Sequence, residues 1–178
     1  VLKSEDSRVL AGLNITTDAL ISTMAFANKQ YTDADTDGIP EYVRDSWAVG
    51  RSEDLDNDGN KDKEAYLVHW TEMTNADDDG NPEWNQTFNM VGWKVDLNDD
   101  GVFDTEKGLM TNTTSYDNNT NGHVELKETG IVGFEKSDDD YDGVLDVERY
   151  AGLWEKVTDV NDDGTEINKQ SGTWFHEA

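Results

Sequence analysis

The sequence contains no cysteine, which excludes disulfide bridges, thiol catalysis and metal sites built on thiolates. It is also poor in basic residues: 14 Lys and Arg stand against 40 Asp and Glu, and the net charge is −26. Binding to nucleic acid through phosphate contacts needs a basic face, so we expect no nucleic-acid partner. No apolar run reaches the roughly 18 residues of a membrane span, so we expect no membrane insertion either.

Apolar residues are scarce as well. They make up 34% of the chain, and that figure together with the high charge is typical of disordered proteins. Six Trp, six Tyr and five Phe are nevertheless more aromatic residues than a disordered chain usually carries. A folded core therefore requires something that offsets the negative charge.

Seven acidic strings of nine residues, spaced 21 residues apart, organise the chain. They begin at Asp33, Asp54, Asn75, Asp96, Asp117, Asp138 and Asp159. Each has Asp or Asn at positions 1, 3 and 5 and Gly at position 6, and six of the seven have Asp or Glu at position 9. An acidic turn without a metal needs one or two such residues, whereas the same pattern repeated seven times indicates a ligand.

The pattern suits a calcium ion, which takes about six to eight oxygen ligands at about 2.3–2.6 Å. Side chains at positions 1, 3 and 5 can converge on one ion when the loop curls, and Gly at position 6 permits the sharp turn. Position 7 offers its backbone carbonyl, and position 9 closes the ring. Magnesium tolerates so crowded and flexible a cage poorly.

The spacing assigns the metal ligands loop by loop. In chain order they are Asp33, Asp35, Asp37 and Glu41; Asp54, Asp56, Asp58 and Asp62; Asn75, Asp77, Asp79 and Glu83; Asp96, Asn98, Asp100 and Asp104; Asp117, Asn119, Asn121, Glu125 and Glu128; Asp138, Asp140, Asp142 and Asp146; and Asp159, Asn161 and Asp163. The loops at Asp33, Asp54 and Asp138 have four carboxylates each and should bind best. The loop at Asp159 has two and carries Ile167 at position 9, so its site should be weak.

The strings resemble the EF-hand-like calcium loops of thrombospondin type 3 repeats, dockerins and integrin FG-GAP repeats. The first copy, DADTDGIPEY, is most similar to bacterial thrombospondin type 3 repeats. The resemblance covers the loops and not the 12 residues between them, and it implies Ca²⁺ as the ligand, up to about seven ions. A full EF-hand also has a bidentate Glu at position 12, and here only Glu128 fits.

The segments between the loops predict strands. Apolar residues gather at their centres, glycine recurs in mid-segment at a cost of about 1 kcal/mol each to a helix, and Thr-rich stretches favour strands. We expect an all-β fold, an antiparallel meander closed as a sandwich or barrel, with seven calcium-binding turns. Odd and even copies differ in sequence. This difference favours an antiparallel meander, in which successive turns lie at opposite ends of the sheet. A helix before the loop, as in dockerins, is the alternative, most plausibly over 41–49.

Residues 1–32 differ from the acidic repeats at 33–178, because they hold three acidic and three basic residues. Alternation over 9–16 predicts a strand, and 17–28 fits either a short helix or a second strand. This N-terminal segment either completes the core of its own chain or inserts into a neighbouring molecule as a donor strand. Because the chain starts at Val1, we expect a processed product or a trimmed chain.

The sequence offers little for catalysis, and we expect no enzyme. Three His occur, and no nucleophile, phosphate loop or zinc motif accompanies them. We expect an extracellular or cell-surface, calcium-stabilised structural or adhesive protein, which self-assembles with copies of itself as a surface or filament subunit joined through its N-terminal segment. The alternative is a calcium-dependent carbohydrate-binding module, in which Trp47, Trp84 and Trp93 stack on a polysaccharide.

Overall fold

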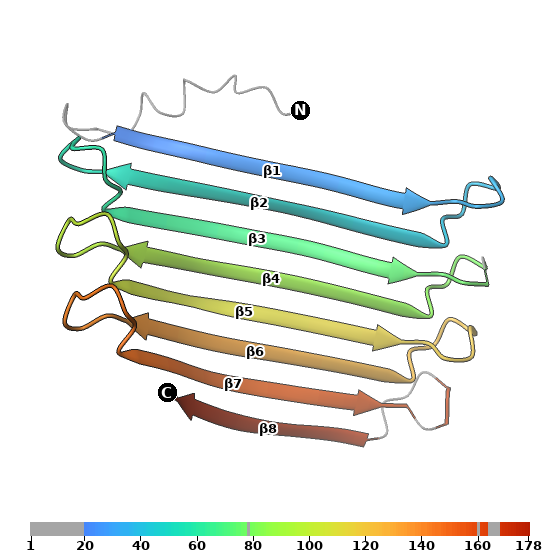
Figure 1. Ribbon diagram of the computed structural model, residues 1–178. Helices are drawn as coiled ribbons and strands as arrows, with labels where there is room; N and C mark the ends of the chain where they lie inside the picture. Colours follow the sequence, from blue (N-terminus) through green and yellow to red (C-terminus); the bar gives the residue numbers. More distant parts are fainter. Residues whose placement is uncertain (1–19, 78, 160, 164–167) are drawn as a thin grey trace, which may run out of the picture.

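The computed structural model describes residues 20–77, 79–159, 161–163 and 168–178. They form eight strands in one antiparallel sheet, in which each strand pairs with its neighbours in sequence (Figure 1). The strands are β1 (Leu20–Thr32), β2 (Tyr42–Asp54), β3 (Lys63–Thr74), β4 (Trp84–Val95), β5 (Thr105–Tyr116), β6 (Leu126–Ser137), β7 (Val147–Thr158) and β8 (Asn168–Glu177). No helix occurs among these residues, so the all-β meander is confirmed.

Two local alternatives are resolved by the strand bounds. The helix considered over 41–49 is wrong, because β2 runs through that segment. The described part of the N-terminal segment is β1, which pairs with β2 along its whole length and thus belongs to the same sheet. The strand predicted over 9–16 lies outside the described residues.

All strand pairs share one flush register, so that rows of side chains run straight across the sheet. One such row contains Met24, Gly50, Tyr66, Gly92, Gly108, Phe134, Tyr150 and His176. A barrel requires a stagger between strands, and this register provides none. The predicted barrel is therefore wrong: β1 and β8 lie at opposite edges of an open sheet, and no second sheet covers it within the described residues.

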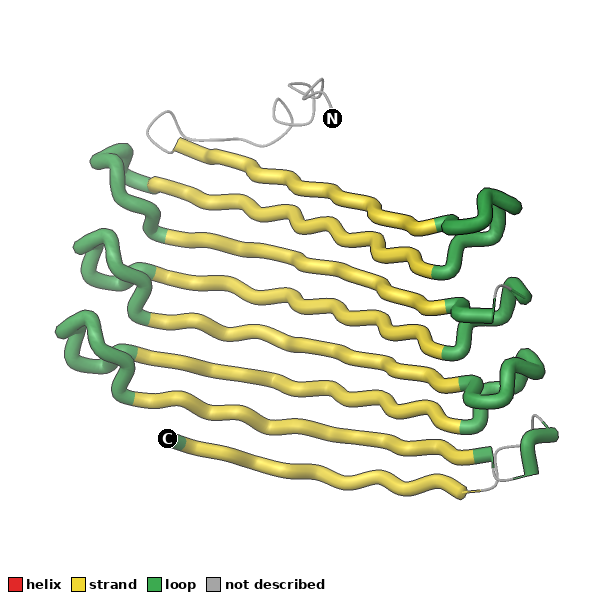
Figure 2. Tube along the Cα trace, turned by 45° about the vertical axis from the view of Figure 1, so that its right-hand side comes forward, coloured by secondary structure: helices red, strands yellow, loops and turns green. Residues whose placement is uncertain are grey.

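The seven loops alternate between the two ends of the strands, as the differences between odd and even copies predicted (Figures 1 and 2). Loops 54–62, 96–104 and 138–146 share one end. Loops 33–41, 75–83 and 117–125 share the other with the loop that begins at Asp159. Each end of the sheet is thus a column of acidic loops.

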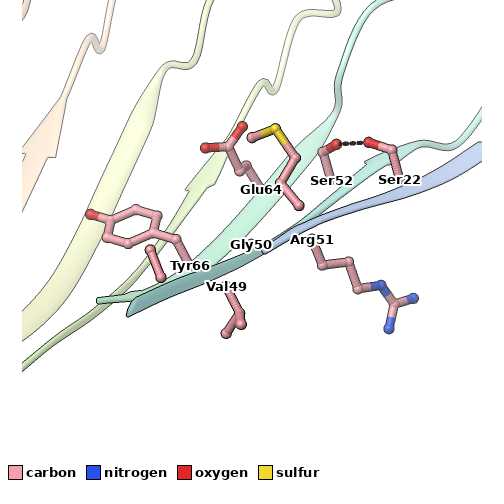
Figure 3. A pocket seen from close by; sticks show the side chains of 9 residues that line it. Ser22, Val49, Gly50, Arg51, Ser52, Glu64 and Tyr66 are labelled. Atoms are coloured by element: carbon pink, nitrogen blue, oxygen red, sulfur yellow. Dashed lines mark hydrogen bonds between the residues drawn. The ribbon is translucent and has the colours of Figure 1, made fainter. Parts of the chain in front are cut away.

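The sheet has two unlike faces. The aromatic face carries Met24, Phe26, Tyr66, Val68, Trp70, Phe88, Met90, Met110, Val132, Phe134, Tyr150, Trp154 and Trp174. The aliphatic face carries Trp47, Val49, Leu67, Val91, Trp93, Leu109, Ile131, Leu153 and Phe175. Figure 3 shows this division around Gly50: Tyr66, Glu64, Ser52 and Ser22 lie on one side of the sheet, and Val49 and Arg51 on the other.

Rings on the aromatic face fold over glycines of the neighbouring strand. Tyr66 covers Gly92 and Phe134 covers Gly108, so closely that an added Cβ would lie 2.5 Å from the ring of Tyr66 and 2.6 Å from the ring of Phe134. The hydroxyl of Tyr66 donates to Glu106 (2.7 Å), and burial together with this bond raises the pKa of Tyr66 well above its ordinary value. These glycines give the rings a flat surface on which to lie.

Burial in this protein is the reverse of the usual arrangement. Among the described residues, only Phe134 and Val157 are buried apolar side chains. The buried polar residues include the first position of six loops, namely Asp54, Asn75, Asp96, Asp117, Asp138 and Asp159. The most enclosed atoms therefore lie at the ends of the sheet, in the loops.

Candidate metal centres

One hydrogen-bond pattern shapes the loops. The carboxylate at position 1 accepts a bond from the N–H of the glycine at position 6, as in Asp96 with Gly101 (2.8 Å) and Asp138 with Gly143 (2.7 Å). The side chain at position 5 accepts from the N–H of position 7, as in Asp58 with Asn60 (2.7 Å). These bonds curl the chain so that the side chains at positions 1, 3 and 5 face a common centre.

In the loops where positions 4 and 6 are both described, the backbone has a positive φ at both. Gly at position 6 has a positive φ, as predicted, from 85° at Gly122 and Gly143 to 104° at Gly59. Position 4 also has a positive φ in every described case, although no glycine is there: the residues are Thr36, Asn57, Asp99, Thr120, Tyr141 and Asp162. Sequence reasoning missed position 4, because its residue type varies and carries no signal.

The acid at position 9, predicted as a metal ligand, forms a hydrogen bond to the start of its own loop. Its carboxylate accepts from the N–H of position 2, as in Glu83 with Ala76 (2.7 Å) and Asp146 with Asp139 (2.7 Å). At Glu83, burial acts to raise the pKa, but the backbone N–H groups of Ala76 and Asp77 outweigh it and the pKa is lowered. The backbone of its own loop thus favours the ionised form of Glu83.

Three loops bring acidic oxygens together closely enough to hold a metal ion. The clusters are Asp33, Asp35 and Asp37; Asp54, Asp56 and Asp58; and Asp138, Asp140 and Asp146, with the ligand atoms of each cluster within 4.8 Å of one another. They lie in the three loops that the sequence ranks as richest in carboxylates. The carboxylates in these clusters repel one another. At Asp140 the pKa is raised by the charge of Asp142, by burial and by the charge of Asp146.

The donor chemistry of these clusters fits a hard cation. All the converging atoms are carboxylate oxygens, which calcium and magnesium prefer. In loop 33–41, Oδ1 of Asp33 is buried and has no hydrogen-bond partner in the part of the chain that the structure describes. A buried carboxylate oxygen without a partner costs free energy, and a cation would satisfy it.

The other four loops contain their predicted ligands. Within their described residues, however, no three acidic side chains bring oxygen atoms as close together. Loop 117–125 has amides at positions 3 and 5, Asn119 and Asn121. Glu128, the extra ligand predicted for it, lies in β6, where its carboxylate forms an ion pair with Lys156 (3.1 Å). Ile167 lies outside the described residues.

Loops at the same end of the sheet are joined by backbone hydrogen bonds. The N–H of position 1 donates to the carbonyl of position 9 in the preceding loop at that end. The pairs are Asn75 with Glu41, Asp96 with Asp62, Asp117 with Glu83, Asp138 with Asp104 and Asp159 with Glu125, at 2.8–2.9 Å. Backbone hydrogen bonding between neighbouring strands therefore continues into the loops.

Position 4 places an aspartate beside the preceding loop in each column. Asp99 lies next to loop 54–62, where its carbonyl accepts from the side chain of Asn60 (3.5 Å). Burial raises the pKa of Asp99, and so do the charges of Asp56, Asp58 and Asp62. Asp99 thus adds a further carboxylate to a loop that already has four.

Asp162 makes the opposite kind of contact with loop 117–125. One of its carboxylate oxygens, Oδ2, accepts hydrogen bonds from the amide groups of Asn119 and Asn121. Its carbonyl lies 3.3 Å from Nδ1 of His123. Neither aspartate was predicted as a functional residue, although the alternation of the repeats places each of them two repeats beyond the loop that it contacts.

Comparison with known proteins gave no match: no family model fits the sequence, and no curated protein or solved structure matches it. Within the described residues there is also no helix with the length and hydropathy needed to cross a membrane. The loops and the sheet therefore carry the functional argument by themselves.

Proposed function

We propose that this chain is an extracellular or cell-surface protein with a structural or adhesive role, and that calcium ions in its loops stabilise the fold. The observation that carries the proposal is the reversed burial. The enclosed side chains are acids in the loops, and the apolar side chains lie on two open faces. Such a sheet needs cations at its ends before it can form a stable surface.

Calcium accounts for the ligand set better than magnesium does. The loops offer many flexible carboxylates and a backbone carbonyl, whereas magnesium demands near-ideal octahedral geometry and retains its waters. Seven calcium ions, the full set, would reduce the net charge from −26 to −12. Loops without the bidentate Glu of an EF-hand should bind in the range of about 10⁻⁴–10⁻³ M, which extracellular calcium saturates.

Two open faces and two open edges in the described part of the sheet support self-assembly. Exposed side chains such as Phe26 (60% exposed) and Leu153 (54%) form continuous apolar areas on a sheet one layer thick. Large exposed apolar patches are typical of interaction surfaces. We infer that the partner is another copy of the chain, and that the N-terminal segment takes part in the joint.

Light scattering during a calcium titration of chelator-stripped protein tests the proposal. Scattering should rise steeply as calcium reaches the millimolar range, and an equal concentration of magnesium serves as the control. Removal of residues 1–15 tests the part of the N-terminal segment that precedes β1. A protein that remains monomeric at every calcium concentration would exclude the assembly role.

Carbohydrate binding is the second candidate, and it rests on a specific observation. Trp47 and Trp93 are both exposed on the aliphatic face, 37% and 48%, and a flat sheet presents their rings to a sugar chain. Trp84 lies on the other face and cannot join them. Affinity electrophoresis in polysaccharide gels with calcium would detect binding, and Trp93→Ala should abolish the retardation without loss of the fold.

A further inference from the structure

The two outer strands of the sheet have unpaired edges. Among the described residues, β1 pairs only with β2, and β8 pairs only with β7. Backbone N–H and C=O groups on the free side of an edge strand lack partners in the sheet and form a template for another strand. These edges are the places where a second chain could extend the sheet.

Neither edge carries the features that normally block such pairing. Proteins protect edge strands with proline, bulges, several charges or short length. Here β1 has 13 residues and one charged side chain, Lys29, and β8 has 10 residues with the balancing charges of Lys169 and Glu177. Neither strand contains proline, and both pair with their neighbours in an unbroken register.

The distribution of charge favours contact between copies at these edges. With a net charge of −26, two copies repel each other strongly wherever acidic loops meet. The edge strands contribute almost nothing to that charge, since β1 carries only Lys29 and β8 is balanced. Edge-to-edge contact is thus a mode of association that brings two weakly charged strands together.

The topology also makes the two edges complementary. Because the sheet is a meander of eight strands, β1 and β8 run in opposite directions, as the arrows in Figure 1 show. When copies are placed side by side in the same orientation, β8 of one lies antiparallel to β1 of the next. The meander then continues across the junction without a change in direction.

We propose that copies of this chain associate head to tail, with β8 of one copy paired to β1 of the next. This inference rests on the proposed function and identifies the joint through which the subunits assemble. Since each row of side chains runs straight across the sheet, a continued row joins its last member to its first. Trp174 then lies opposite Phe26 of the next copy, and Thr173 lies opposite Ala27.

This register matches side chains of the same kind. Trp174 and Phe26 end one row of the aromatic face, and both are exposed, 42% and 60%. Aromatic pairs directly across two strands contribute roughly 0.2–1 kcal/mol each. The contact is not closed by symmetry, since each copy still has one free edge, so it generates a filament. Loop 33–41 of one copy then lies at the same end of the sheet as the described acids Asp159 and Asp163 of its neighbour, so we expect the joint to require calcium.

Disulfide trapping tests this register, because the chain has no cysteine of its own. Two single-cysteine variants, Ala27→Cys and Thr173→Cys, are mixed in calcium and gently oxidised. Both positions are exposed on the aliphatic face. Opposite residues in an antiparallel pair lie about 4.5–5.5 Å apart between Cα atoms, which is within the range that a disulfide spans.

The mixture should give a disulfide-linked dimer, at least tenfold more than either variant alone and only when calcium is present. Thr23→Cys mixed with Thr173→Cys is the matched control, because Thr23 lies on the same face about 13 Å along the strand. Circular dichroism of each variant in calcium establishes that it folds like the unaltered chain. Dimers from Ala27→Cys alone, or equal trapping with Thr23→Cys, would overturn the head-to-tail register.

The outcomes separate this inference from the proposed function. Calcium-dependent scattering without a trapped dimer would show that copies associate through another surface, such as a face of the sheet. The edge joint would then be wrong, and the assembly role would stand. If neither scattering nor trapping occurs, both fail. A trapped dimer in the predicted register without large scattering supports edge pairing that is limited to short oligomers.

Discussion

The ends and the middle of the sheet are held together by different interactions. At the ends, the first side chain of six acidic loops is buried. Backbone hydrogen bonds join neighbouring loops at the same end of the sheet. In the middle, most apolar side chains remain half-buried or exposed, and rings either lie over glycines or stack on a ring of the neighbouring strand, as Trp70 does on Phe88. We expect the ends to depend on cations and the middle to depend on contacts between neighbouring strands.

This contrast explains how a chain with little apolar mass can still form a sheet. A single-layer sheet buries too little surface to offset the conformational entropy of its residues. Cation binding that occurs only in the folded loops adds folding free energy at both ends of each strand. Changes in the loops should therefore alter the stability of the fold strongly, and changes on the faces of the sheet should alter it more moderately.

Removal of calcium should have the largest effect. Carboxylates that converge in the loops repel one another when no cation is present, so we expect the chain to lose most of its sheet in excess chelator. Far-ultraviolet circular dichroism before and after chelation measures this, and restored calcium should recover the signal. A native-like spectrum in chelator would show that the sheet forms without cations in the loops. The proposed dependence of the two ends on cations would then be wrong.

The middle of the sheet should respond most to the glycines beneath the rings. In Gly108→Ala, the added Cβ would lie 2.5 Å from the carbonyl oxygen of Val91 and 2.6 Å from the ring of Phe134. We expect a loss of about 1–3 kcal/mol, because the backbone carbonyl cannot move aside. Thermal unfolding in saturating calcium measures the change.

Gly130→Ala is the matched control for that substitution. Gly130 lies in β6 with nothing within 4 Å of an added Cβ, so alanine should be neutral or slightly stabilising. Equal losses at Gly108 and Gly130 would mean that strand propensity, rather than the ring contact, determines the effect.

Much of this contrast could be predicted from the sequence. The period of 21 residues located every described loop, and glycines with Thr-rich stretches correctly excluded helices between them. The apolar runs at the strand centres predicted that both faces are covered, by a sandwich, a barrel or packing between molecules. The described residues form one open sheet, so the barrel is wrong. Side-chain patterns report that a face is apolar, but not whether the same chain covers it.

The contacts between loops were beyond sequence reasoning for a related reason. Position 4 varies among Thr, Asn, Asp and Tyr, so it looks like a free position. Only the structure shows that position 4 has a positive φ, and that Asp99 contacts Asn60 and Asp162 contacts Asn119, each two repeats away.

Within the loops, a ligand should matter more than an adjacent acid. Asp140→Asn replaces a carboxylate in the cluster of loop 138–146 with a neutral amide oxygen, which is a weaker ligand, and we expect calcium affinity at that loop to fall about tenfold. Asp139→Asn makes the same change in charge at an exposed position outside the cluster and should leave affinity nearly unchanged. Isothermal titration with calcium gives both values. Equal effects would mean that total charge, not coordination, sets the affinity.

The smallest effects should come from the two position-4 aspartates, and they should differ in kind. Asp162 holds the amides of Asn119 and Asn121 by hydrogen bonds that need no cation. Asp162→Asn should therefore lower the Tm by about 2–4 °C, which corresponds to about 1 kcal/mol, by the same amount at every calcium concentration. A plot of Tm against the logarithm of calcium concentration would shift downward without a change in slope.

Asp99→Asn should instead change that slope. Asp99 faces Asp56, Asp58 and Asp62, so its removal relieves repulsion when calcium is scarce and weakens attraction for the cation when calcium is abundant. The slope reports how many cations bind on folding, because each bound ion stabilises the folded state by mass action. A shallower line for Asp99→Asn beside a parallel one for Asp162→Asn would assign one aspartate to a cation site and the other to a cation-free contact. If Asp162→Asn also reduced the slope, loop 117–125 would bind calcium with Asp162 as a ligand, and the two columns of loops would work in the same way.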